Sequence, residues 1–206
     1  MEQELKQIFI FIFAVMLCSF IIYNSTDTSK YQITEYEIIE EPEDTIPIID
    51  IFNPYAISEA GKEFIKRVEN LSLISYWDAT GYAIGYGHHG KDIYKDMIID
   101  SIQADIYFNE DLLKIEKSVE RLIKGLPYEY NFSQGFIDGL SSLVYNCGES
   151  GIKETDFYQR LRQCRVENGI MNEDDWNFAM SVIKETKISQ EGHIKRRNEE
   201  FWMMLD

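Results

Sequence analysis

Two carboxylates occupy positions at which they could catalyse hydrolysis. Glu69 lies at the end of an expected helix, near the apolar Leu71, and Asp78 follows nine positions later, where a glycine-rich stretch begins. Cleavage of a glycosidic bond needs one carboxyl group that is protonated and a second that is ionised. Apolar neighbours favour the protonated form of a Glu, whereas an Asp in a solvated setting stays ionised. The pair could therefore serve as acid and base across a shared cleft.

Placement alone leaves a plain structural explanation open for both residues. The chain holds 36 acidic residues, so two of them can fall at such positions by chance. Glu69 could be a solvated residue at a helix end. Asp78 could be a turn residue whose side chain bonds to the backbone.

The pattern around the two carboxylates predicts a helix followed by a small sheet. Residues 58–70 have helical spacing of their apolar side chains. Residues 71–89 are rich in Tyr and Gly, which is typical of a small antiparallel hairpin sheet. Glu69 would then end the helix and Asp78 would open the hairpin, on opposite walls of one cleft.

A helical lobe is expected after the sheet. Asp100 followed by Gln103 has the pattern of a capping box, and a long amphipathic helix is expected from there to about Lys124. The apolar positions of that helix are Ile102, Ile106, Leu113, Val119, Leu122 and Ile123. Further helices are expected from Ser133 to near Gly148 and over residues 154–163, 173–185 and 193–204. The fold class is therefore α+β, with a small hairpin sheet lobe and a larger helical lobe.

The chain divides into three segments. Residues 1–23 hold an uncharged apolar run, whose length lies between the ~20 residues of a spanning helix and the roughly 7–15 of a cleavable signal. Its Phe and Ile content favours a transmembrane anchor, and a cleaved signal is the alternative. Residues 24–55 are acidic and contain three prolines, which predicts a flexible linker. Residues 56–206 are the expected domain, located beyond the inner membrane in the periplasm or cell-wall space.

Composition excludes some classes of function. The net charge of −16 excludes nucleic acid as a partner, because phosphate contacts need Lys and Arg. The spacing of the three cysteines matches no metal motif. Cys147 and Cys164 are expected as two separate buried thiols, with a disulfide between them as the alternative.

Several motifs, taken in order, resemble the phage-type lysozymes, the T4- and P22-like endolysins of glycoside hydrolase family 24. The strongest is the run Gly81-Tyr82-Ala83-Ile84-Gly85-Tyr86-Gly87-His88, which follows Glu69 and Asp78. The other matches are the stretches 103–112, 132–140 and 144–148, and Arg196-Arg197 with Glu199. The resemblance covers about residues 56–204 and has the family's order and spacing.

The resemblance implies a lysozyme-like fold of two lobes. It also implies an endolysin that hydrolyses the β-1,4 bond between N-acetylmuramic acid and N-acetylglucosamine for host cell lysis. Glu69 would be the general acid, and Asp78 would position or activate the water, with inversion at the anomeric carbon. The expected partners are peptidoglycan strands and, through residues 8–23, the inner membrane. The enzyme is expected to be a monomer that uses no metal or cofactor.

Five residues are candidates for substrate binding: Tyr82, Tyr86, His88, Tyr145 and Asn146. The three tyrosines could line a sugar groove or pack in the interior. His88 could face the cleft or bond within the hairpin, and Asn146 could bond the glycan or cap its helix. The neighbouring His89 is expected at the surface.

One departure from the family pattern bears on the mechanism. The family usually has a catalytic Thr where this chain has Ala83, and the stretch from Asp78 to Ile84 is one residue shorter than usual. The hydroxyl that helps to hold the water is missing unless Thr80 or Ser75 supplies it. Two alternatives therefore stay open: a lytic transglycosylase on the same scaffold, and an inactive membrane-anchored module that binds glycan.

Overall fold

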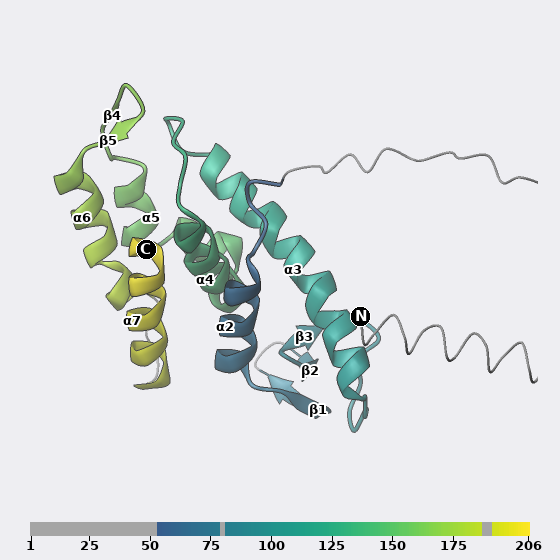
Figure 1. Cartoon of the computed structure of the whole chain (residues 1–206). Helices are drawn as coiled ribbons and strands as arrows, with labels where there is room; N and C mark the ends of the chain where they lie inside the picture. Colours follow the sequence, from purple (N-terminus) through teal and green to yellow (C-terminus); the bar gives the residue numbers. More distant parts are fainter. Residues whose placement is uncertain (1–52, 79–80, 187–190) are drawn as a thin grey trace, which may run out of the picture. The chain divides into compact units, whose positions relative to one another are not determined.

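The computed structural model describes residues 53–78, 81–186 and 191–206 (Figure 1). The expected anchor, residues 1–23, and most of the expected linker, residues 24–55, lie outside these ranges. Among the residues that are described, no helix is both long and apolar enough to cross a membrane. The described chain forms a small sheet lobe and a larger helical lobe, as the sequence predicts.

The sheet lobe begins with helix α2 (Glu59–Glu69). Ser58 caps this helix, because its hydroxyl accepts a hydrogen bond from a main-chain amide of the first turn. The helix stops at Asn70, whose backbone has a left-handed φ of 59°. Three antiparallel strands follow in the order β1 (Ser72–Asp78), β2 (Gly81–Gly85) and β3 (His88–His89). The expected helix and hairpin sheet are therefore confirmed.

Helix α3 (Ser101–Lys124) is the long helix that the sequence predicts. Asp100 caps it by accepting a hydrogen bond from the amide of Gln103 (2.8 Å). The predicted core positions are partly wrong, since three of them are exposed: Ile102 (70%), Ile106 (46%) and Leu113 (61%). The buried stripe is instead Ala104, Phe108, Leu112, Val119 and Leu122. The helix carries two apolar stripes, and periodicity alone does not show which one the sheet covers.

The helical lobe is built around α4 (Gln134–Lys153), which packs against α2, α3 and α7 (Figure 1). Phe136, Leu140 and Val144 of this helix are buried in the main core. Gly148 interrupts the helix with φ 70° and ψ 159°, at the residue near which the sequence predicts its end. The remaining helices are α5 (Asp156–Leu161), α6 (Glu173–Ser181), the 3₁₀ helix Ile183–Glu185 and α7 (Glu191–Leu205).

A second hairpin, β4 (Val166–Glu167) and β5 (Ile170–Met171), is absent from the expectations above. Its turn consists of Asn168 and Gly169, with φ values of 52° and 76°. Two successive left-handed residues make the turn that joins short hairpins, and Asn-Gly is its strongest sequence signal. The pair Asn168-Gly169 therefore could have predicted this hairpin from the sequence.

Gly135 allows α4 and α7 to approach closely. A Cβ at this position would lie 2.2 Å from the carbonyl oxygen of Met203, a main-chain atom that cannot rotate away. We expect Gly135→Ala to force the helices apart and to lower the free energy of unfolding by about 1–3 kcal/mol. Gly151→Ala in the same helix is the control, because its Cβ would be only in ordinary contact, at 3.5 Å, with a side-chain atom. Thermal unfolding measures both, and an unchanged Tm for Gly135→Ala would contradict this packing.

Candidate active site

Glu69 is held at the end of α2 by an arginine from α7. Nη1 of Arg196 donates to Oε1 of Glu69 at 2.6 Å, and the two side chains are 7% and 20% exposed. The sequence suggested apolar surroundings for Glu69, but Leu71 and Leu73 are exposed at 42% and 38%. That expectation is wrong, because both leucines are exposed and α7 brings a cation to the carboxylate.

Arg196 is itself held by buried polar groups. Its guanidinium donates to Oε1 of Glu200 (2.9 Å) and to the carbonyl oxygen of Ser142 (2.9 Å). Burial acts to lower the pKa of Arg196, but the charges of Glu69 and Glu200 hold that pKa above its usual value. The arginine is therefore a fixed positive charge beside Glu69.

A second arginine ties this cluster to the rest of the helical lobe. Arg197 is fully buried and donates to Glu200, to the side-chain oxygen of Asn146 and to the carbonyl oxygen of Thr186. The sequence pattern paired the two arginines with Glu199. The buried partner is Glu200, whereas Glu199 forms ion pairs at the surface with Arg67 and Lys195.

One face of the sheet carries Asp78. Residues that are directly opposed in a sheet point to the same face, as do residues two apart along a strand. Tyr76 pairs with Ala83, and Ala83 pairs with His89, so these three side chains form a row across β1, β2 and β3. Asp78, two residues after Tyr76, lies on the same face. Nε2 of His89 lies 3.1 Å from Oδ2 of Asp78.

The phenol of Tyr76 is influenced by both carboxylates. Burial raises the pKa of its phenol, and the negative charges of Asp78 and then of Glu69 raise it further. The Tyr145 phenol likewise has a raised pKa, caused by burial first and then by Asp111 and Glu69. The charges of both Asp78 and Glu69 therefore act on the Tyr76 phenol. Tyr76 was not expected at the site, although its place two residues before Asp78 could have revealed it.

The three candidate tyrosines are half-buried and contact other aromatic rings. Tyr82 packs edge-to-face on Trp77, with centroids 5.2 Å apart, and Tyr86 lies 5.1 Å from the ring of Phe108. The hydroxyl of Tyr145 donates to the carbonyl oxygen of Tyr86 (2.9 Å), which joins α4 to the hairpin. Packing accounts for these positions, and a role in sugar binding stays a prediction.

His88 and Asn146 also have partners within the protein. His88 is buried, its Nδ1 lies 2.8 Å from Oδ2 of Asp111, and its ring stacks on Tyr107 at 4.3 Å. Asn146 accepts a hydrogen bond from Arg197. Neither contact is the structural alternative considered above, because His88 contacts α3 instead of the hairpin and Asn146 contacts α7. Glycan binding by either residue stays a prediction.

The sequence model of the phage lysozyme family matches residues 66–200. This chain belongs to the phage lysozyme family. It is 27% identical over 152 residues to an endolysin of Bacillus phage B103, in a match that covers 72% of this chain and 54% of the phage protein. The chain therefore spans about half the length of the curated relatives that it matches.

Solved structures confirm the lysozyme-like α+β fold. An endolysin from Escherichia coli O157:H7 phage FAHEc1 is 29% identical, with a TM-score of 0.54, and the match covers 73% of this chain and 93% of that one. The muramidase domain of SpmX from Asticaccaulis excentricus is 23% identical, with a TM-score of 0.59, and the match covers 73% and 97% of the two chains. The second likeness concerns the fold alone.

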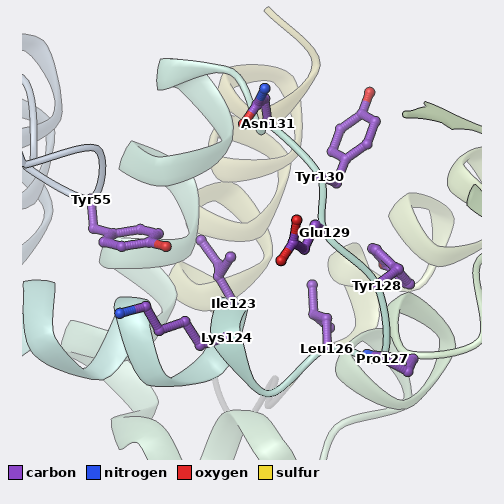
Figure 2. Close-up of a pocket in the computed structure, with 9 residues that line it drawn as sticks. All are labelled: Tyr55, Ile123, Lys124, Leu126, Pro127, Tyr128, Glu129, Tyr130 and Asn131. Atoms are coloured by element: carbon purple, nitrogen blue, oxygen red, sulfur yellow. The ribbon is translucent and has the colours of Figure 1, made fainter. Parts of the chain in front are cut away.

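A hollow of about 560 Å³ lies elsewhere on this family member. Figure 2 shows Tyr55, Ile123 and Lys124 on one side of it and the stretch 126–131 on the other. Glu129 is the one carboxylate in its lining. Because glycoside hydrolysis needs a pair of carboxyl groups, this hollow does not qualify as the catalytic cleft.

The described residues contain no cluster of three or more His, Cys, Asp or Glu side chains that could hold a metal ion. Cys147 and Cys164 do not form a disulfide with each other. Cys164 is buried, and Sγ of Cys147 lies 3.4 Å from Nη2 of Arg197. The expectation of two separate buried thiols is therefore right for Cys164, whereas Cys147 is a separate thiol that is only half-buried.

Proposed function

We propose that this chain is an N-acetylmuramidase that hydrolyses the β-1,4 bond between N-acetylmuramic acid and N-acetylglucosamine in peptidoglycan. The observation that carries the proposal is the position of Glu69 at the end of α2, paired with Arg196, and of Asp78 at the end of β1, the next element along the chain. Membership of the phage lysozyme family supports a glycoside hydrolase that acts on the cell wall.

In the proposed reaction, a protonated Glu69 donates its proton to the glycosidic oxygen as the C–O bond breaks. Asp78 accepts a proton from a water molecule whose oxygen attacks the anomeric carbon from the opposite face. Attack opposite to the leaving group inverts the configuration of the sugar. Asp78 is suited to act as the base, because its side chain is 50% exposed and can receive water.

Arg196 has two carboxylate partners. Its Nη1 donates to Oε1 of Glu69 at 2.6 Å, and its Nε donates to Oε1 of Glu200 at 2.9 Å. When Glu69 carries a proton, Arg196 keeps a second partner in the fully buried Glu200. The arginine is therefore not left as an unpaired buried charge, which would be costly.

The proposal is tested by identifying the new chain ends. Purified peptidoglycan is incubated with the full chain, and the products are reduced with borohydride before amino-sugar analysis. Muramitol is the expected product, because the bond on the reducing side of muramic acid is cut. Glucosaminitol in its place would move the cleavage to the other linkage, and the absence of both would contradict glycosidase activity.

Ala83 favours a second candidate function. A lytic transglycosylase closes the muramic acid onto its own 6-hydroxyl and needs no held water, so that the lack of a hydroxyl at this position would not matter. Products with 1,6-anhydro ends would identify a transglycosylase.

A glycan-binding module without activity would bind peptidoglycan and would release neither reducing ends nor 1,6-anhydro ends.

We also propose that the protein acts as a monomer in the cell-wall space, where it serves host lysis. The uncharged apolar run within residues 1–23 supports export, either as an anchor or as a cleaved signal. N-terminal sequencing of the protein from membrane and soluble fractions separates the two. An intact N-terminus in the membrane fraction supports an anchor, and a soluble form that begins after residue 23 supports cleavage.

A further inference from the structure

His89 contacts the proposed base. Its Nε2 lies 3.1 Å from Oδ2 of Asp78, and the two side chains are 40% and 50% exposed. An ionised carboxylate only accepts hydrogen bonds, so His89 is the donor of this contact. The hydrogen bond ties β3 to the end of β1 at the point where water has access to the Asp78 carboxylate.

The strand register places His89 beside the position where the family has a hydroxyl. Ala83 on β2 is directly opposed to His89 on β3. Opposed side chains point to the same face, with Cβ atoms about 4.5–5.5 Å apart. Ala83 is fully buried and offers only a methyl group. In this row, the imidazole of His89 lies within hydrogen-bond distance of Asp78.

We infer that His89 is a positioning residue for hydrolysis, which rests on the proposed muramidase function. It orients the carboxylate of Asp78 through a hydrogen bond to Oδ2, so that the carboxylate can accept a proton from the attacking water. In the step itself the water oxygen bonds to the anomeric carbon, its proton passes to Asp78, and the glycosidic oxygen leaves with the proton of Glu69. His89 thus holds the base in place from the neighbouring strand, in a site where position 83 supplies no hydroxyl.

A purely structural role fits His88 better than His89. His88 is buried against Tyr107 and Asp111 and fixes β3 to α3. The His89–Asp78 pair is open to solvent, and a pair with that exposure contributes little to the stability of the fold. Substitution of His89 is therefore expected to leave the folded structure intact, so that an effect on activity can be interpreted.

The test uses the full chain and compares three substitutions of His89 for kcat and KM on soluble peptidoglycan fragments. We expect His89→Ala to lower kcat by roughly 10- to 100-fold, a part of the 10²–10⁴ that a positioned base contributes, with KM nearly unchanged. His89→Gln should retain most of the activity, because its amide nitrogen can occupy the place of Nε2. His89→Asn, whose amide is too short to reach Asp78, should behave like His89→Ala.

A double variant gives an independent test. In Ala83→Thr with His89→Ala, removal of the imidazole makes room for a hydroxyl at the opposed position, and kcat should rise at least fivefold above that of His89→Ala alone. Full activity of His89→Ala would overturn the inference. So would equal losses of activity in His89→Gln and His89→Asn together with no rescue in the double variant. Either result would leave the muramidase proposal standing. If the wild type releases no reducing ends, both are wrong.

Discussion

Replacing Glu69 by Gln should lower kcat for the release of muramic-acid reducing ends by about 10³-fold, because a positioned general acid contributes roughly 10²–10⁴. The amide oxygen of Gln can still accept the hydrogen bond that Arg196 donates at 2.6 Å, so the local structure should persist. What is removed is the proton that the leaving sugar oxygen requires. The measurement is the initial rate of reducing-end release from purified peptidoglycan.

Glu63→Gln is the matched control for this substitution. It makes the same chemical change on the same helix, α2, but at an exposed position. We expect it to retain wild-type activity and stability. If Glu69→Gln kept more than a tenth of the wild-type rate, Glu69 would not be the acid, and the site would have to be assigned to other carboxylates.

Replacing Glu200 by Ala should lower the free energy of unfolding by about 3–5 kcal/mol, the cost of removing one partner of a buried ion pair. Glu200 is fully buried and is the acid shared by Arg196 and Arg197, whose side chains are 7% and 0% exposed. Without Glu200, the hydrogen bonds described above leave Arg197 only two neutral partners, Asn146 and the carbonyl oxygen of Thr186. Denaturant unfolding followed by circular dichroism measures the loss.

Glu199→Ala tests whether burial, rather than charge, causes that effect. Glu199 is the adjacent residue, and its ion pairs with Arg67 and Lys195 lie at the surface. Exposed pairs contribute about 0–1 kcal/mol, so this variant should unfold close to the wild type. A loss as large as that of Glu200→Ala would show that the two acids were assigned to the wrong environments.

The parts of the fold that follow local rules could be predicted from the sequence. The caps Ser58 and Asp100, the left-handed residue after α2 and the Tyr- and Gly-rich hairpin each depend on residues close in the chain. The placement of Glu69 at a helix end came from the same local rules, whereas Asp78, which was expected to open the hairpin, is the last residue of β1. The Asn168-Gly169 hairpin obeys them too and was overlooked.

The surroundings of the site depend on contacts between distant segments and could not be predicted in this way. Glu69 meets Arg196, which is 127 positions away, and the choice of Glu200 over Glu199 depends on how α7 turns against α4. The exposed Ile102 and the buried Ala104 likewise reflect which stripe of α3 the sheet covers. His89 was expected to be a plain surface residue, because only the strand register shows that it lies beside Ala83.

The most direct test of hydrolysis at the Glu69–Asp78 site is the digestion of purified peptidoglycan in water enriched in oxygen-18, followed by mass spectrometry of the released fragments. We expect one heavy oxygen at the anomeric carbon of each new muramic-acid end with the wild type, and no new ends with Glu69→Gln. Fragments that end in 1,6-anhydro muramic acid and carry no label would contradict hydrolysis and identify a transglycosylase. Intact peptidoglycan after prolonged incubation would contradict an enzymatic role altogether.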